Sequence, residues 1–342
     1  MIETTPQAAL PAAVLVAVDC GDYDVSASLD ELSELAKSAQ IQPVSRVIQK
    51  RSSPDTATCI GSGRLEELKQ LCEADGAQLV LFDCELSPTQ LRNLEKETKL
   101  RVMDRTMLIL DIFPARAHTS EGKLQVELAT LRYMLPRLTG RGVEMSRIGG
   151  GAGTRTRGAG ETQLETDRRH IRRRIDSLRR RLNEVEQRRE HLRTHRKKAG
   201  TPTVALVGYT NAGKSTLMNA LTDAGVLAED KLFATLDPTA RALKLPGGQT
   251  VILIDTVGLV RRLPHHLVDA FRSTLEEAAM ADVILNVCDA SSPEAAVHLE
   301  VTRDLLDSPG GGDTPVIPVH NKCDQVGGLD ALPAVGNAVR IS

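Results

Sequence analysis

A single motif, Gly208-Tyr-Thr-Asn-Ala-Gly-Lys-Ser215, limits the possible folds more than any other part of this 342-residue chain. It fits Gly-x-x-x-x-Gly-Lys-Ser and lies between an apolar run at 203–207, which predicts a buried strand, and residues 216–221, whose apolar spacing predicts a helix. Glycines in such a turn let backbone N–H groups and the helix N-terminus face a polyphosphate. The motif therefore predicts a P-loop α/β domain that binds a nucleoside triphosphate. A glycine turn with an incidental lysine is the alternative.

Three further segments follow at spacings that strengthen this prediction. An apolar run ends in Asp255-Thr-Val-Gly258, where the acid can hold Mg²⁺ through water and the Gly258 N–H can face the γ-phosphate. A second buried strand is predicted at 283–289 and a third at 316–320, which leads into Asn321-Lys-Cys-Asp324. The Asp324 carboxylate can accept from the N1–H and the 2-amino group of guanine, a pair of donors that adenine lacks. Together these segments predict a guanine-nucleotide switch and resemble a Ras-like GTPase domain.

The motifs also assign roles to individual residues. Lys214 would place its charge on the β/γ-phosphates, and the Ser215 hydroxyl and Asp255 would ligate Mg²⁺. Lys214 and Gly258 are therefore predicted to take part in catalysis. The predicted nucleotide-binding residues are Gly208, Tyr209, Thr210, Asn211, Ala212, Gly213, Lys214, Ser215, Thr216, Asp255, Thr256, Val257, Gly258, Asn321, Lys322 and Asp324.

Composition bounds the class of protein. The net charge is −2, yet residues 141–200 hold 18 Lys and Arg against 8 Asp and Glu, a balance of +10 that leaves −12 for the rest. A basic middle in an acidic chain predicts nucleic-acid contact at one site. The six cysteines include no Cys-x-x-Cys pair, so neither a zinc site nor a disulfide framework is expected, which suits a reducing cytosol. No apolar run approaches membrane-spanning length.

Residues 1–115 alternate between predicted strands and predicted helices. Strands are expected at 14–18, 44–48, 79–82 and 101–103, and helices at 29–39, 65–72 and 87–98, the last capped by Ser87 and Pro88. This order predicts a small domain with a parallel sheet. Its one candidate site is the glycine turn at 60–64, which could meet a phosphate or simply begin a helix. The domain has no second Gly-x-x-x-x-Gly-Lys motif.

Residues 116–200 are predicted to form an antiparallel helical hairpin, followed by the P-loop GTPase domain at 201–342. Two segments show apolar residues at alternating steps of 4 and 3, and Pro136 should end the first helix near Leu135. The connecting loop is rich in glycine and too long to pack as a core element. It carries the predicted RNA-binding residues Arg141, Arg147, Arg155 and Arg157, whose side chains suit phosphates and splayed bases. A flexible linker with solvated charges is the alternative.

Several stretches together resemble the HflX family of translational GTPases. They are Gly158-Ala-Gly-Glu-Thr-Gln-Leu-Glu-Thr-Asp-Arg-Arg169, the P-loop motif, Phe233-Ala-Thr-Leu-Asp-Pro-Thr239, and Asp255-Thr-Val-Gly258 with Leu263-Pro-His-His-Leu267. The resemblance covers nearly the whole chain. It implies an α/β fold in which a parallel N-terminal domain and a helical hairpin precede a Ras-like P-loop GTPase domain.

The resemblance also implies a function and partners. Such proteins bind the large ribosomal subunit and its rRNA, split or rescue stalled ribosomes, and hydrolyse GTP to GDP with Mg²⁺ as cofactor. A cytoplasmic, ribosome-associated monomer is expected. By position, Thr235 is the switch I threonine, expected to complete Mg²⁺ coordination and to act in catalysis, with Thr239 as the fallback. Asn211 matches the P-loop asparagine that some related GTPases use to recruit K⁺.

Two departures from the related sequences affect the prediction. Leu259 occupies the position of a water-orienting glutamine, so hydrolysis is expected to be slow until a ribosome completes the site. The chain stops at Ser342, where a Ser-Ala motif that packs on guanine should begin, so the GTPase domain is expected to lack its last motif and helix. Two alternatives remain open, a ribosome-assembly or RNA-scaffolding GTPase and a non-enzymatic RNA-binding fragment.

Overall fold

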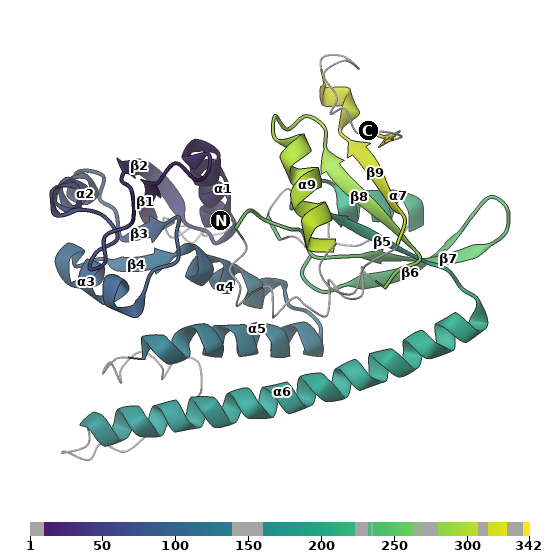
Figure 1. Cartoon of the computed structure of the whole chain (residues 1–342), viewed down its shortest axis with the longest axis horizontal. Coiled ribbons are helices and arrows are strands. Elements are labelled where there is room, and N and C mark those ends of the chain that lie inside the picture. Colours follow the sequence, from purple (N-terminus) through teal and green to yellow (C-terminus); the bar gives the residue numbers. More distant parts are fainter. Residues whose placement is uncertain are drawn as a thin grey trace, which may run out of the picture.

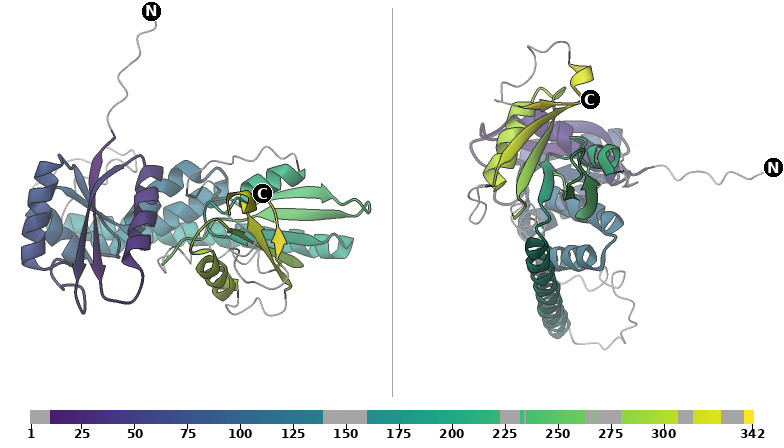
Figure 2. Two further views of the ribbon diagram at one scale, coloured as in Figure 1. Left: turned by 90° about the horizontal axis from the view of Figure 1, so that it is seen from above. Right: turned by 90° about the vertical axis from the view of Figure 1, so that its right-hand side faces the viewer.

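The computed structural model describes residues 10–138, 160–222, 232–233, 235–262, 267, 280–306, 314–326 and 338–342. They form an N-terminal unit, a helical hairpin and a C-terminal unit that carries the P-loop. The N-terminal and C-terminal units lie side by side, and helix α6 runs along both (Figures 1 and 2). Within the described residues, no helix is both long and apolar enough to cross a membrane.

The N-terminal sheet has four strands, all parallel, in the order β2-β1-β3-β4. The strands are β1 (Ala12–Asp19), β2 (Gln42–Lys50), β3 (Leu79–Phe82) and β4 (Arg101–Asp104). Each lies where the sequence predicted a strand. A parallel sheet requires a crossover between successive strands, and here each crossover contains one helix.

Helices cover both faces of this sheet. They are α1 (Val25–Ser38), α2 (Ser62–Ala74), α3 (Pro88–Thr98) and α4 (Arg105–Arg116). Along β1 the side chains alternate, so that Ala13 and Leu15 pack with α1 and α4, whereas Val14 and Val16 pack with α2 and α3. The result is a three-layer α/β/α unit with two apolar layers.

Local capping fixes where these helices begin. Asp24 accepts hydrogen bonds from two backbone N–H groups of the first turn of α1. Ser87 and Gln90 form a capping box at the start of α3, with Pro88 at its first position, as the sequence predicted. Helix α4 was not predicted, and it lies beside the expected domain boundary.

The hairpin pairs α5 (Ser120–Met134) with α6 (Gly160–Ala199), and a single 3₁₀ turn, η1 (Leu135–Arg137), follows α5. The pairing is antiparallel because Glu121 contacts Arg189 at 2.7 Å, whereas Glu127 contacts Arg174 at 2.6 Å. Helix α5 ends just before Pro136, as predicted. The apolar seam contains Leu124, Leu128, Leu131, Leu135, Leu138, Ile171, Ile175, Leu178 and Leu182. The antiparallel hairpin and its predicted apolar seam are confirmed.

The C-terminal sheet has six strands in the order β10-β9-β8-β5-β7-β6, with β6 antiparallel to β7 and the other pairs parallel. The strands are β5 (Thr203–Gly208), β6 (Thr239–Lys244), β7 (Thr250–Asp255), β8 (Val283–Asp289), β9 (Val316–Asn321) and β10 (Val339–Arg340). Its helical elements include α7 (Lys214–Thr222), α9 (Ala295–Leu306) and the 3₁₀ turn η3 (Cys323–Gln325). The predicted α/β fold class is confirmed.

One apolar cluster joins the two units. Five residues of the C-terminal unit pack in the same cluster as β1, α1, α4 and α5, namely Phe233, Leu236, Val257, Val260 and Leu267. The ring of Phe233 meets that of Phe113 on α4 edge to face, with centroids 4.9 Å apart. Segments next to the predicted nucleotide site therefore help to fill the core of the N-terminal unit.

Candidate nucleotide-binding site

The P-loop connects the end of β5 to the start of α7. Gly213 has φ +91°, and a Cβ there would lie 2.1 Å from the side-chain nitrogen of Asn321. That nitrogen donates to the carbonyl oxygen of Ala212 at 2.9 Å. The predicted base motif thus braces the predicted phosphate loop, and only glycine fits between them.

Lys214 is folded back on the loop that precedes it. Its ammonium donates to the carbonyl oxygens of Gly208 and Tyr209, at 3.1 and 2.8 Å, and the residue is only 6% exposed. Burial lowers the pKa of Lys214 to about 8, and the Asp255 carboxylate acts in the opposite direction. A polyphosphate in the loop would supply the anionic partner that this buried cation needs.

Three oxygen-bearing side chains converge beside Lys214. The Ser215 hydroxyl lies 2.7 Å from the Thr235 hydroxyl and donates to one carboxylate oxygen of Asp255 at 2.7 Å. Asp255 is fully buried, which raises the pKa of its carboxyl group, and its Oδ1 atom accepts no hydrogen bond within the described residues. Hydroxyl and carboxylate oxygens suit a hard cation such as Mg²⁺. These residues fit a metal that also binds phosphate oxygens and water.

The described residues of this region form no metal site whose ligands all come from His, Cys, Asp or Glu side chains. Among the described residues, no group of three or more His, Cys, Asp or Glu side chains could hold a metal ion. A Mg²⁺ ion at Ser215, Thr235 and Asp255 would therefore depend on ligands from a nucleotide and from water, as Mg²⁺ sites at phosphates usually do.

The segment after β7 runs against the start of the P-loop. The Thr210 N–H donates to the Leu259 carbonyl at 2.7 Å, and the Leu259 N–H donates to the Gly208 carbonyl at 3.1 Å. A Cβ on Gly258 would lie 2.7 Å from the Thr210 Cα, so glycine is required for this approach. The same Cβ would lie 3.1 Å from Nζ of Lys214, so the backbone of Gly258 lies beside the P-loop lysine.

Several predicted site residues point their side chains elsewhere. The Thr256 hydroxyl donates to the Leu206 carbonyl at 2.7 Å, and Val257 packs in the shared apolar cluster. Ala212 is buried among α7 and the sheet. Asn211, with φ +61°, and Thr216 lie on the exposed surface of the loop and of α7. Thr256 and Val257 could therefore contact a nucleotide through their backbone atoms alone, because their side chains are engaged elsewhere.

Tyr209 also turns away from the phosphate loop. Its hydroxyl donates to the Glu31 carboxylate on α1, and its ring stacks on His298 of α9 with centroids 3.8 Å apart. The Leu259 side chain, 2% exposed, packs against Tyr209 in a small apolar cluster. The Leu259 side chain therefore points into the apolar core of this unit.

The base motif is held at the end of β9. Lys322 donates to the Asp289 carboxylate at 2.6 Å, and the Cys323 N–H donates to the Ile341 carbonyl at 3.1 Å. Asp324 lies on η3 and is exposed. The structure thus brings Asn321, Lys322 and Asp324 to the same edge of the sheet as the P-loop.

A group of charged residues between the two units was not found from the sequence. Arg105 donates to Asp83 at 2.8 Å and to the Arg261 carbonyl at 3.1 Å, and it pairs with Glu31. Arg262 also reaches Asp83, at 3.2 Å. We call Glu31, Asp83, Arg105, Tyr209, Arg261 and Arg262 the interface cluster. No spacing in the sequence signals it, because its members come from distant segments.

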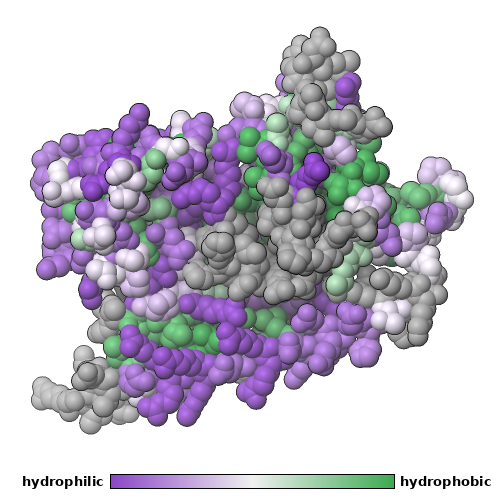
Figure 3. Space-filling view, viewed as in Figure 1, coloured by the Kyte–Doolittle hydropathy of each residue, from purple (hydrophilic) through white to green (hydrophobic). Residues whose placement is uncertain are grey.

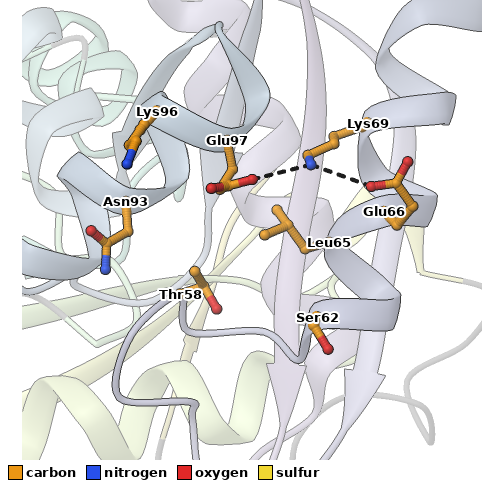
Figure 4. Close-up of a pocket in the computed structure, with 8 residues that line it drawn as sticks. All are labelled: Thr58, Ser62, Leu65, Glu66, Lys69, Asn93, Lys96 and Glu97. Atoms are coloured by element: carbon orange, nitrogen blue, oxygen red, sulfur yellow. Dashed lines mark hydrogen bonds and ion pairs between the residues drawn. The ribbon is translucent and has the colours of Figure 1, made fainter.

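The glycine turn at 60–64 gains no support as a phosphate site. Residue Gly61 caps α2, and its N–H donates to the Gln49 side chain at 2.9 Å. A pocket of about 380 Å³ lies nearby, between α2 and α3 (Figure 4). Its Lys69 contacts Glu66 at 3.3 Å and Glu97 at 3.2 Å, so that its charge is paired. The turn is best explained as the start of a helix.

The predicted RNA-binding residues Arg141, Arg147, Arg155 and Arg157 lie outside the described residues, as do residues 263–266. The neighbouring helix α6 is described, and its exposed arginines include Arg169, Arg173, Arg181 and Arg188. In Figure 3 a hydrophilic band follows α6 along the lower edge of the molecule.

Comparison with known proteins identifies the family. Residues 26–114 match the family described as GTP-binding GTPase N-terminal, residues 116–196 the GTP-binding GTPase Middle Region, and residues 203–322 the 50S ribosome-binding GTPase. A GTPase HflX from Lacrimispora saccharolytica is 54% identical over 313 residues, which cover 91% of this chain and 73% of that protein. GTPase HflX from Escherichia coli is 47% identical over 298 residues, with 87% and 70% covered.

A solved structure extends the likeness to the fold. The structure of the SsGBP and GDP complex aligns with a TM-score of 0.53 at 26% identity, over 97% of this chain and 92% of that one. The identity to curated relatives extends over nearly the whole chain. The P-loop and the Asp255 motif lie within the matched GTPase region, which ends at Lys322 of the base motif. The chain belongs to the HflX family and is a GTP-binding GTPase.

Proposed function

We propose that this protein is a GTP-controlled factor that binds the large ribosomal subunit and separates or rescues stalled ribosomes in the cytoplasm. The observation that carries the proposal is the convergence of Ser215, Thr235 and Asp255 beside Lys214. These residues come from the P-loop, from the segment before β6 and from the end of β7. One nucleotide bound there would connect all three segments and so couple its γ-phosphate to their positions.

The nucleotide site works with Mg²⁺ in this proposal. Ser215, Thr235 and Asp255 would hold the ion, and Mg²⁺ supplies positive charge to the β- and γ-phosphate oxygens. Lys214 adds charge from the P-loop, and the Gly258 N–H would contact the γ-phosphate. Asp324 and its neighbours read guanine. We include K⁺ at Asn211, to be checked by exchanging K⁺ for Na⁺ in the hydrolysis assay.

Contact with rRNA is assigned to the hairpin. Helix α6 carries 14 Lys and Arg against 7 Asp and Glu, and much of this charge is exposed along its length. In Figure 1 this helix forms the lower edge of the molecule, with α5 above its first half. A long basic face presented by a rigid helix suits an RNA backbone. The arginine loop at 141–157 would extend this face, and the match of residues 203–322 to the 50S ribosome-binding GTPase family supports the same partner.

Sedimentation tests the proposal directly. Intact ribosomes are mixed with the full chain and a non-hydrolysable GTP analogue, GDP or no nucleotide, and are then resolved on sucrose gradients. We expect the protein to migrate with large subunits and the fraction of intact ribosomes to fall with the GTP analogue alone. Lys214→Ala should abolish both effects. If the protein binds only precursor particles, it is an assembly factor, and the absence of any co-sedimentation contradicts ribosome binding.

The arginine loop can be tested separately. Changing Arg147, Arg155 and Arg157 to alanine should weaken ribosome binding and flatten its salt dependence by up to about one unit of slope per lost phosphate contact. GTP affinity measured off the ribosome should not change, because the pocket is built from other residues. The control replaces Arg46, Arg64 and Arg101, which lie on the N-terminal unit and change the charge equally. If the two triple variants weaken ribosome binding equally, the binding depends on the net charge of the protein and not on the position of these arginines.

A further inference from the structure

Two cysteine thiols of the N-terminal unit are in direct contact. The Sγ atoms of Cys59 and Cys84 lie 3.3 Å apart and share a hydrogen bond, although 25 residues separate them along the chain. All six cysteines of the chain are free thiols in the structure. The contact therefore brings together two reduced thiols that nothing in the nucleotide site uses.

The fold holds Cys59 in a defined place. It closes a tight turn with Asp55, in which Asp55 N–H donates to the Cys59 carbonyl at 2.8 Å and Cys59 N–H donates to the Asp55 carbonyl at 3.0 Å. Cys59 has φ +65°, a conformation that non-glycine residues adopt rarely and mostly where the surroundings impose it. Two side chains of α3, Gln90 and Asn93, bind backbone carbonyls of the turn, at 2.6 and 3.0 Å. The Cys59 sulfur is thus fixed relative to α3.

Cys84 approaches from the segment between β3 and α3. It follows Asp83 at the end of β3, and it is partly exposed, whereas Cys59 is only 1% exposed. Both segments leave the sheet at the carboxyl ends of their strands, so the parallel topology itself brings the two sulfurs together. The more exposed thiol is therefore the one that a small reagent in solution can reach.

The local chemistry makes the pair unequal. The hydrogen bond from Cys84 lowers the pKa of Cys59 below the usual value for a thiol, whereas the same bond, together with burial, raises the pKa of Cys84. The negative charge of a singly deprotonated pair therefore resides on Cys59. Thiolate is the form of cysteine that attacks disulfide bonds. Burial, with a smaller contribution from the Asp75 charge, raises the pKa of Cys72 to about 11.

We propose that Cys59 and Cys84 form a reversible redox site that is oxidised to a disulfide by a small external disulfide of the glutathione class. As Cys84 attacks one sulfur of the external disulfide, it passes its proton to the Cys59 thiolate across the hydrogen bond that the two sulfurs share, and the external S–S bond breaks to release one thiolate. Cys59 then gives that proton to the released thiolate and attacks Sγ of Cys84 in the mixed disulfide, which displaces the second external sulfur as a thiolate. Two protein sulfurs are oxidised and one external disulfide is reduced. One released thiol carries the proton of the pair, and the other takes its proton from water.

The site lies next to the contact between the two units. Asp83, which precedes Cys84, accepts from Arg105 and Arg262 of the interface cluster and from Ser28 at 2.7 Å. A disulfide would tie the segment that carries Asp83 to the turn at 55–59. In a reducing compartment such bonds are transient and sense redox conditions. Oxidation of Cys59 and Cys84 would therefore change the covalent structure next to the contact between the two units.

Peptide mapping of the folded full chain tests this site. The protein is equilibrated under native conditions in mixtures of reduced and oxidised glutathione, remaining thiols are alkylated, and the chain is digested without reduction. Cys72 and Cys84 share the tryptic peptide 70–92, so a second protease that cuts before aspartate is needed to separate them. We expect one linked pair, residues 55–64 with residues 83–92, the loss of two of the six free thiols, and full recovery with dithiothreitol.

Variants sharpen the result. Cys84→Ser should remove the linked pair, and Cys20→Ser, at a partly buried cysteine that follows β1, should leave it intact. The proposal is overturned if the native protein forms no link in oxidised glutathione alone. It is equally overturned if Cys20 or Cys72 takes the place of either partner, or if the 59–84 link forms only after unfolding. The wild-type map decides the matter even if the Cys84→Ser variant fails to fold.

Discussion

The guanidinium of Arg262 donates to the carboxylate of Asp83 at 3.2 Å and lies 4.0 Å above the ring of Tyr23. Arg262 follows the Asp255-Thr-Val-Gly258 motif by four residues, and Asp83 directly follows β3 of the N-terminal unit. Asp83 also binds Arg105 and Ser28, at 2.8 and 2.7 Å. One buried carboxylate thus joins the segment that follows the Asp255 motif to the neighbouring sheet.

Replacing Asp83 by asparagine should therefore destabilise the whole chain. The change keeps the shape but leaves buried Arg105 with Glu31 as its remaining anionic partner, and breaking a buried ion pair costs about 3–5 kcal/mol. Urea unfolding measures the loss. The control is Glu34→Gln, which removes an exposed pair with Lys37 and should cost less than about 1 kcal/mol. Equal stability of the two variants would contradict a structural role for Asp83.

GTP affinity should fall as the pH rises above about 8. Burial lowers the pKa of Lys214 to about 8 from the ordinary 10.5, so the free site loses its cation within this range. Bound phosphates favour the charged form, so binding takes up a proton, and affinity weakens by up to about tenfold for each pH unit. Titration calorimetry at several pH values measures this.

The Lys214→Met variant supplies the control for that titration. It should bind GTP weakly and lack the lysine-dependent part of the fall, because ionisation of guanine itself affects both proteins equally. Parallel pH profiles for the two proteins would show that Lys214 does not titrate in the site. The stability of the nucleotide-free protein should change with pH in the opposite direction to its GTP affinity. Between pH 8 and 10.5 the unfolded chain keeps the proton that folded Lys214 has lost, so the free energy of unfolding rises with pH.

Asp324→Asn should move nucleotide preference from GTP toward XTP. Xanthine has a carbonyl where guanine has its 2-amino group, and asparagine can donate to that carbonyl. Loss of hydrogen bonds to a charged acceptor costs about 1.5–3 kcal/mol, so GTP affinity should fall by roughly 10- to 100-fold. Competition binding ranks the two nucleotides. Gln325→Ala changes the next exposed residue of η3 and should keep the order of the parent protein.

Installing glutamine at Leu259 should not accelerate hydrolysis by the free protein. The Leu259 side chain packs with Tyr209 in a buried cluster, so a glutamine there would place its amide among apolar atoms and away from the nucleotide. We expect a loss of about 2–4 kcal/mol in unfolding free energy and no gain in phosphate release. Leu259→Met keeps volume and polarity and should cost less than about 1.5 kcal/mol. Faster turnover by Leu259→Gln would show that this position can reach water.

The phosphate loop and most strands were predictable because their signals are local, whereas β6 and β10 were not predicted. Apolar runs bounded by turn residues marked the strands, and Ser87 with Pro88 marked the start of α3. The base motif and the P-loop were both found, and their contact through Asn321 and Ala212 follows from parallel strands that end at one edge of a sheet.

Helix α4 and the interface cluster were missed for physical reasons. Residues 108–110 of α4 are all buried, so the helix lacks the polar face that gives a period of 3.6, and Pro114 interrupts its last turn. Tyr209 was assigned to the nucleotide because of its place in the motif, yet its hydroxyl binds Glu31. Contacts between residues far apart in the sequence, such as this one, produce no recognisable pattern in the spacing of residues along the chain. The contact between Cys59 and Cys84 was invisible for the same reason.

The shared apolar cluster has a consequence for how the chain folds. Phe233, Leu236, Val257, Val260 and Leu267 complete the core of the N-terminal unit, so neither unit can bury its apolar surface alone. A fragment that begins at residue 201 would expose these side chains and would tend to aggregate. The two units should accordingly unfold on heating in one cooperative transition. During synthesis the N-terminal unit is made first, so its core would stay incomplete until the C-terminal unit has also been made.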